Sequence, residues 1–112
     1  MFTKNLKFEI YTYSYFQMST FSGYGLTECV AGFAISPFRG HTPSGSVGKI
    51  VPEIEARIVD PETGRDVRPG ESGELLFRGH NVMRGYFRKP DRTAATIESN
   101  GFMRTGNGGL CL

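Results

Sequence analysis

The chain has 112 residues, which is enough for one domain and too few for two of ordinary size. Its 38% hydrophobic and 21% charged content is typical of a globular protein with a core, and so excludes a disordered or collagen-like chain. The net charge of +2, with basic residues scattered along the chain, gives no support to a nucleic-acid partner or an anionic membrane surface.

The two cysteines indicate neither a metal site nor an oxidising compartment. Cys29 and Cys111 lack the CxxC or Cys/His spacing of zinc ligands. A disulfide between them is compatible with the sequence, but we expect two free thiols. Polar residues interrupt the apolar stretch that a signal peptide needs, and no membrane span is expected. We take the cytoplasm as the default location, and the C-terminal Leu-Cys-Leu does not support a peroxisomal address.

In chain order, the first predicted elements are short. Residues 8–16 alternate loosely and predict a strand. Residues 23–28 predict a loop, because Gly-Tyr-Gly does not easily extend a helix or a strand. The apolar run of residues 30–35 is compatible with a strand or a helix. Residues 39–48 are rich in Gly, Pro, Ser and Thr and predict another loop.

The middle of the chain predicts an antiparallel pair of strands. Apolar and charged residues alternate over residues 54–59, as expected of a half-buried strand. Asp-Pro-Glu-Thr-Gly (60–64) predicts a turn, since proline fixes φ and glycine accepts positive φ. Val67 is the expected start of the return strand. A second turn over residues 68–73 leads into a strand over residues 74–78.

One short helix and a last strand complete the prediction. Lys-Pro-Asp-Arg-Thr (89–93) opens the helix with Asp91 as the expected N-cap, and the two alanines that follow favour helix. Asn-Gly (100–101) predicts a turn before a strand over residues 102–105. The chain is therefore expected to be a β-rich α+β module, mostly antiparallel.

The first candidate site is Phe-Ser-Gly-Tyr-Gly-Leu-Thr-Glu (21–28). Gly23 and Gly25 let the backbone approach a ligand closely, and the ring of Tyr24 could stack on a flat base. Thr27 offers a hydroxyl to a phosphate oxygen, and Glu28 offers a hard carboxylate to Mg²⁺. The alternative interpretation is a structural turn or helix cap.

Two further motifs carry less chemistry. Gly-Glu-Leu-Leu-Phe-Arg-Gly (73–79) and Val-Met-Arg-Gly-Tyr (82–86) contain no reactive group, and we interpret them as scaffold. Residues 101–109 predict a strand that ends in a polar Thr-Gly-Asn-Gly loop, which either carries a ligand or simply turns the chain.

The order of the motifs resembles that of the adenylate-forming ligases. This family includes 4-coumarate and fatty acyl-CoA ligases, firefly luciferase and the adenylation domains of peptide synthetases. The resemblance is carried by residues 23–28, by Gly-Ser-Val-Gly-Lys-Ile-Val-Pro (45–52), by Gly-Glu-Leu with Gly79 and Gly-Tyr (85–86), and by Arg-Thr-Gly (104–106). It covers about residues 23–106 and is nearest to the acyl-CoA ligase and luciferase branch.

The resemblance implies a domain assignment. Residues 1–20 are left unassigned, and residues 21–112 are expected to form the C-terminal part of the large N-terminal, AMP-binding domain. That part is mainly a small distorted antiparallel β-barrel subdomain with short helices. Apolar residues that face other subdomains in the family, among them Phe33, Ile35 and Phe38, are expected to be exposed here.

The resemblance also implies an activity and its residues. A carboxylic acid attacks ATP to give an acyl-adenylate, and coenzyme A then takes the acyl group. Tyr24 would pack on adenine, Thr27 would hold a phosphate oxygen and Glu28 would bind Mg²⁺, so that Thr27 and Glu28 are the candidate catalytic residues. The candidate nucleotide-binding residues are Gly23, Tyr24, Gly25, Thr27 and Asn107.

Several positions depart from the family pattern. Asn107 replaces an aspartate that binds the ribose hydroxyls, which would cost about 1–3 kcal/mol of nucleotide binding. Ser22 replaces a usual glutamine. The lysine-bearing phosphate loop and the domain with the catalytic lysine do not occur in the sequence, so we expect an inactive internal fragment. A non-catalytic β-rich binding module is the alternative, and a luciferase-type oxygenase would share the same motifs.

Overall fold

The computed structural model of the chain describes residues 2–3, 22–30, 32–36 and 43–111. The strand expected over residues 8–16 and the first part of the loop expected over residues 39–48 lie outside these ranges. The described elements are, in chain order, β1 (Phe2–Thr3), β2 (Gly23–Gly25), the 3₁₀ helix η1 (Thr27–Cys29), β3 (Gly32–Ile35), β4 (Ser46–Ile50), β5 (Glu55–Val59), β6 (Ser72–Arg78), α1 (Pro90–Thr96) and β7 (Met103–Cys111).

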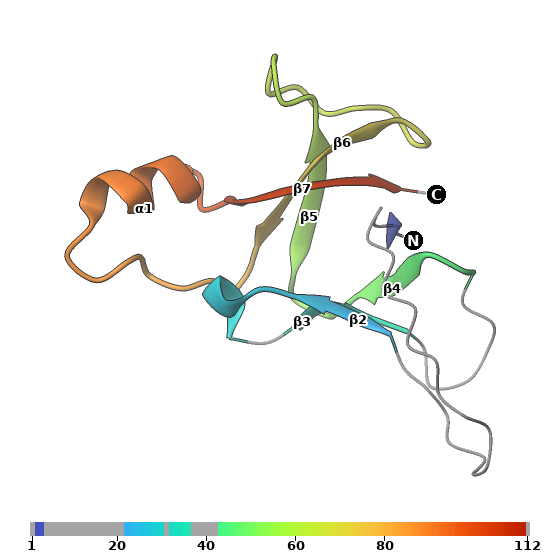
Figure 1. Cartoon of the computed structure of the whole chain (residues 1–112), viewed down its shortest axis with the longest axis horizontal. Helices are drawn as coiled ribbons and strands as arrows, with labels where there is room; N and C mark the ends of the chain where they lie inside the picture. The colour runs from blue at the N-terminus through green and yellow to red at the C-terminus, as the bar shows by residue number, and fades with distance from the viewer. Residues whose placement is uncertain (1, 4–21, 31, 37–42, 112) are drawn as a thin grey trace, which may run out of the picture.

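The strands form an antiparallel sheet in the order β2-β3-β4-β1-β7-β6-β5. The two-residue strand β1 pairs with β4 on one side and with β7 on the other, and so joins two three-stranded halves. Figure 1 shows these halves as separate layers, with β2, β3 and β4 below β5, β6 and β7. The β-rich prediction is confirmed. The strand order is linear, so closure of the expected barrel stays a prediction.

The β5–β6 hairpin follows the sequence prediction closely. Its strands pair over five positions, from Glu55 opposite Arg78 to Val59 opposite Glu74. The predicted turn is present, because Asp60 Oδ1 accepts hydrogen bonds from the backbone N–H groups of Glu62 and Thr63, at 2.8 and 3.1 Å. Val67 does not begin the return strand. It makes one backbone hydrogen bond to this hairpin, and β6 begins only at Ser72.

Aromatic rings tie the two halves of the sheet together. Phe33 of β3 and Phe77 of β6 are both fully buried and stack with ring centroids 3.8 Å apart. Met103 of β7 and Cys29 of η1 are also fully buried, and the Cys29 thiol lies 3.9 Å from the Met103 sulfur. Burial of each large apolar side chain stabilises the fold by roughly 1.5–3 kcal/mol. The expectation that Phe33 is exposed was therefore wrong, whereas Ile35 is 49% exposed and Phe38 lies outside the described residues.

The first motif is more regular than predicted. Residues 23–28 were expected to be a loop, but β2 occupies Gly23–Gly25 and η1 begins at Thr27. The cause is non-local, since β2 is held by antiparallel pairing with β3, where Tyr24 lies opposite Ala34. That pairing also decides between strand and helix for the apolar run of residues 30–35, of which Gly32–Ile35 form strand β3.

Helix α1 starts two residues earlier than the predicted N-cap implies. Pro90 occupies a first-turn position, where its missing N–H is not needed, and Lys89 is the N-cap without a side-chain cap bond. Asp91 was predicted as the N-cap, which is wrong. It lies in the first turn, where a carboxylate still favours the helix dipole. Among the described residues, no helix has the length and apolar character needed to cross a bilayer.

The last strand is longer than predicted and contains the third motif. β7 runs over Met103–Cys111, so the expected loop after residue 105 is wrong. Leu76 of β6 pairs with Arg104, and Glu74 pairs with Gly108. Three residues of β7, 105–107, therefore lie opposite the single residue Leu75. Such a bulge bends a strand and redirects its side chains, which brings a polar segment out of the regular ladder.

Candidate functional site

The first and third motifs meet in the structure. Asn107 Nδ2 in the β7 bulge donates a hydrogen bond of 3.0 Å to the hydroxyl oxygen of Tyr24 in β2. The two residues are 83 positions apart in sequence. Two of the residues predicted to bind a nucleotide therefore lie side by side, at the junction of the two halves of the sheet.

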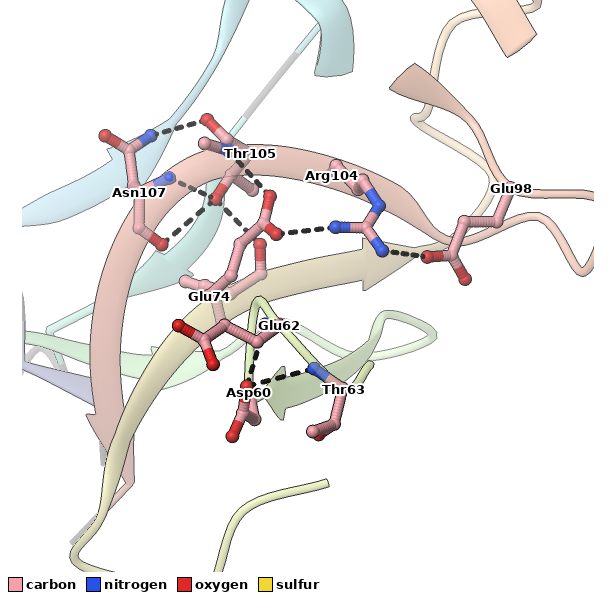
Figure 2. A network of polar contacts seen from close by, with 10 residues as sticks. Asp60, Glu62, Thr63, Glu74, Glu98, Arg104, Thr105 and Asn107 are labelled. Carbon is pink, nitrogen blue, oxygen red and sulfur yellow. Dashed lines mark hydrogen bonds and ion pairs between the residues drawn. The ribbon is translucent and has the colours of Figure 1, made fainter. Parts of the chain in front are cut away.

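Asn107 is fixed by hydrogen bonds to Thr105, as Figure 2 shows. Its Nδ2 also donates to the Thr105 carbonyl at 2.9 Å, and its backbone N–H donates to Thr105 Oγ1 at 3.1 Å. Thr105 Oγ1 in turn donates to the carbonyl of Leu75 at 2.7 Å. Both hydrogens of the Asn107 amide group thus have acceptors within the protein, which gives this residue one defined orientation.

An ion-pair chain supports the bulge from the side. Arg104 lies between Glu74 and Glu98, with N–O distances of 2.8 and 3.1 Å (Figure 2). The other oxygen of Glu74 accepts a hydrogen bond of 3.3 Å from the backbone of Gly106. Gly106 has a φ of 66°, which favours glycine. The carboxylate of Glu74 therefore holds both the strand and the tip of its bulge.

The ring of Tyr24 is part of the core. It is only 6% exposed, and its centroid lies 6.4 Å from that of Phe33 and 6.0 Å from that of Phe77. Burial raises the pKa of the phenol, although hydrogen bonds with Thr105 and Asn107 act in the opposite direction. Stacking on adenine needs an open ring face, so this role of Tyr24 stays a prediction.

Glu28 is held at both its backbone and its side chain. Tyr86 donates a hydrogen bond of 2.7 Å from its hydroxyl to Glu28 Oε1, and Met83 N–H donates to the Glu28 carbonyl at 2.8 Å. The hydrogen bond from Tyr86 lowers the pKa of the Glu28 carboxyl below its ordinary value. The neighbouring Glu28 raises the pKa of Tyr86. The carboxylate is therefore ionised at neutral pH while the phenol keeps its proton.

The other predicted residues of the first motif lie on the surface. Thr27, Gly23 and Gly25 are exposed, so a ligand has access to this edge of β2 and to the start of η1. The structure gives no contact that brings the hydroxyl of Thr27 to Asn107 or to Tyr24. The roles of Thr27 and of the two glycines in binding stay predictions.

Glu28 could bind a Mg²⁺ ion only together with ligands from a nucleotide and water. Within the described ranges, no group of three His, Cys, Asp or Glu side chains lies close enough together to hold a metal ion. Mg²⁺ in nucleotide sites, however, is usually bound by one or two carboxylates together with phosphate oxygens and water. A carboxylate has about four acceptor sites, so the hydrogen bond from Tyr86 leaves Glu28 free to contribute one ligand.

Tyr86 is the residue that sequence reasoning assigned to the scaffold and that the structure places at the site. A tyrosine hydroxyl needs a polar partner, and the residues around Tyr86 in sequence do not point to one. Its partner, Glu28, is 58 positions away. The only available signal was that the Gly-Tyr motif occurs together with the Thr-Glu motif in the same sequence.

Comparison with known proteins identifies the family. The chain matches the AMP-binding enzyme family over residues 12–87, more than half of its length. The chain belongs to the AMP-binding enzymes. A 4-coumarate–CoA ligase-like protein of Arabidopsis thaliana is 40% identical over 105 residues, covering 92% of this chain and 18% of that protein. Luciferin 4-monooxygenase of Photinus pyralis is 41% identical over 85 residues, covering 76% of this chain and 15% of the relative.

Solved structures agree with this membership. ATP-bound MatB from Rhodopseudomonas palustris matches with a TM-score of 0.74 and 35% identity, covering 80% of this chain and 18% of MatB. An anthranilate CoA ligase, AuaEII, matches with a TM-score of 0.71 and 30% identity, covering 79% of this chain and 16% of that enzyme. The chain therefore spans less than a fifth of the length of these relatives. The predicted family is confirmed. The family match begins inside the segment that we left unassigned, and the boundary at residue 20 stays a prediction.

Proposed function

We propose that the chain supplies part of the nucleotide site of an acyl-CoA ligase. In that enzyme a carboxylic acid would attack ATP to form an acyl-adenylate and pyrophosphate, and coenzyme A would then accept the acyl group. The observation that carries the proposal is the contact between Tyr24 and Asn107, which joins two motifs that are 83 positions apart in sequence. Membership of the AMP-binding family, with CoA ligases among the relatives, supports it.

Each residue has a proposed role in that site. Thr27 and Glu28 act on the phosphates, with Thr27 donating its hydroxyl to an oxygen and Glu28 contributing one ligand to Mg²⁺. The metal ion, when bound, neutralises negative charge on the phosphates. Asn107 and Tyr24 border the sugar and the base, beside Gly23 and Gly25. In the complete enzyme the sheet would belong to a distorted β-barrel subdomain.

We further propose that this chain alone does not turn over substrate. It spans less than a fifth of the length of its relatives, so most groups around the acyl chain and the phosphates would come from other segments. Adenylate formation depends on preorganised charge at the reacting phosphate, and loss of one such donor typically lowers the rate by about 10²–10³. Loss of several would remove measurable activity while leaving weak nucleotide binding.

Thermal unfolding in the presence of ATP and Mg²⁺ tests the proposal. At a hundredfold excess of ligand over Kd, binding adds about 2.7 kcal/mol of stability, which raises Tm by roughly 10 °C in a domain of this size. We expect Glu28→Ala to abolish most of this shift in the presence of Mg²⁺. Glu62→Ala, in the exposed turn after β5, is the matched control and should keep it. An equal shift in Glu28→Ala and the control would contradict the role of Glu28.

One observation favours a second function. The ring of Tyr24 is almost fully buried, and the amide of Asn107 is already bonded within the protein, so both residues act as structure in the described state. This is what a non-catalytic binding module derived from such an enzyme would show. Cooperative unfolding with no shift on addition of ATP and Mg²⁺ would favour this alternative.

A further inference from the structure

The segment before α1 holds Glu28 through two separate hydrogen bonds. Tyr86 bonds the Glu28 side chain at 2.7 Å, and Met83 bonds its backbone carbonyl at 2.8 Å. In Figure 1 this segment runs past η1 on its way from β6 to α1. The segment before α1 therefore fixes the positions of both the backbone and the carboxylate of Glu28.

Helix α1 holds Tyr86 in turn. Thr93 Oγ1 accepts a hydrogen bond of 2.9 Å from the backbone of Tyr86 and donates one of 3.0 Å to the carbonyl of Lys89. Gly85 has a φ of 150°, and a Cβ atom there would lie 2.7 Å from Cγ2 of Thr93. Only glycine therefore lets the chain come this close to the helix. The close approach of Gly85 to Thr93 and the hydrogen bond to Thr93 together fix the position of Tyr86 next to α1.

We propose that Tyr86 is a positioning residue that orients the Glu28 carboxylate toward the metal ion of the nucleotide. This inference rests on the proposed role of Glu28 as a metal ligand. Tyr86 occupies one oxygen, Oε1, and the carboxylate retains acceptor sites for a cation. A ligand carboxylate that is held by an outer hydrogen bond binds its metal better than a free one. Loss of such a partner typically weakens metal binding 10–100-fold.

Tyr86→Phe is the decisive variant, because it removes one oxygen atom and keeps the aromatic ring and the backbone hydrogen bond to Thr93. The binding of ATP is measured on the full chain twice, once in EDTA and once with Mn²⁺ at one equivalent per ATP. Broadening of the ¹³C signal of the Glu28 carboxylate by Mn²⁺ shows whether the metal sits at this residue. Glu28→Gln sets the level expected without a metal ligand. Thr63→Val, which removes a hydroxyl from the remote turn after β5, is the matched control.

We expect Tyr86→Phe to change the affinity for ATP when the metal is present and not when it is absent. Tyr86→Phe should weaken the binding of Mn²⁺·ATP 10–100-fold and leave the binding of metal-free ATP within twofold of wild type, with Thr63→Val unchanged in both. A purely structural role would instead weaken both equally, or lower only the Tm, and that result overturns the inference. So does an unchanged Mn²⁺·ATP affinity in Tyr86→Phe when the wild type gains from the metal.

Failure of the underlying function gives a different result. If Mn²⁺ neither improves ATP binding nor broadens Glu28 in the wild type, then Glu28 is not a metal ligand, and both the proposed role of Glu28 and this inference are wrong. An amide spectrum of each variant that retains the dispersion of the wild type confirms that the comparison is made between folded proteins.

Discussion

Asn107 uses an amide where the family pattern has a carboxylate, and the structure gives a physical reason for the amide. Its Nδ2 donates to the hydroxyl oxygen of Tyr24 and to the carbonyl oxygen of Thr105. A carboxylate could accept a hydrogen bond from the Tyr24 hydroxyl, but it cannot donate to the Thr105 carbonyl. The amide therefore stabilises the bulge of β7 in the absence of a ligand, whereas a carboxylate would suit two ribose hydroxyls better.

The substitution Asn107→Asp tests whether the amide raises the stability of the free chain and lowers its affinity for ATP. We expect it to lower the free energy of unfolding by about 1–3 kcal/mol, because the new carboxylate faces the Thr105 carbonyl that now accepts a hydrogen bond. Urea unfolding without nucleotide measures the loss. The same variant should bind ATP more tightly in a direct titration. A variant that is as stable as wild type and binds ATP no better would contradict this account of Asn107.

At the same scale, sequence reasoning singled out the candidate residues that share a local pattern and missed the contacts that depend on a distant partner. Tyr24 and Glu28 were visible because glycine, an aromatic ring and a carboxylate occur together within six residues. The hydrogen bond from Tyr86 to Glu28 joins positions 58 residues apart, and the sequence around Tyr86 contains no pattern that predicts it. The burial of the Tyr24 ring was also missed, because it depends on Phe33 and Phe77 from other strands.

At the scale of the element, the predictions were correct where local chemistry decides the conformation. Strands β5 and β6 alternate or form apolar runs between clear turns, and both were predicted within two residues of their ends. Strand β2 was predicted as a loop, since only its pairing with β3 makes Gly-Tyr-Gly extended. The bulge in β7 was taken for the end of the strand, because Thr-Gly-Asn-Gly reads as a turn unless β6 continues alongside.

The corner before α1 gives a prediction for an element. Gly85→Ala should cost more stability than Gly64→Ala, because a Cβ at Gly85 would lie 2.7 Å from Thr93, while nothing lies within 4 Å of one at Gly64. Both glycines have positive φ, 150° at Gly85 and 69° at Gly64, so alanine strains the backbone in each variant and the clash with Thr93 adds to the loss at Gly85. We expect a further loss of about 1–3 kcal/mol for Gly85→Ala.

Thermal or urea unfolding of the two variants measures this difference. Equal losses would show that the segment before α1 moves away from Thr93 at little cost. In that case the contacts with Thr93 would not hold Tyr86 rigidly. A larger loss in Gly85→Ala that is partly relieved by adding Thr93→Ser would confirm the contact, because serine removes the methyl group 2.7 Å away and keeps the hydroxyl 2.8 Å away.

At the scale of the whole molecule, two three-stranded halves meet through packed rings, among them Phe33 stacked on Phe77, and through the short strand β1. The candidate nucleotide residues lie at this junction, since Tyr24 belongs to one half and Asn107 to the other. Val30 and Phe87 are 87% and 84% exposed, and we propose them as the positions where further segments of the proposed ligase would make apolar contacts.

The proposed nucleotide site lies at the junction of the two halves of the sheet. A titration of the ¹⁵N-labelled chain with ATP and Mg²⁺, followed residue by residue in the amide spectrum, tests it most directly. We expect the largest shifts to occur together in residues 23–28 and 105–108, with the turn after β5 unaffected. Shifts confined to another surface, or a folded spectrum that does not change at saturating ATP, would contradict it.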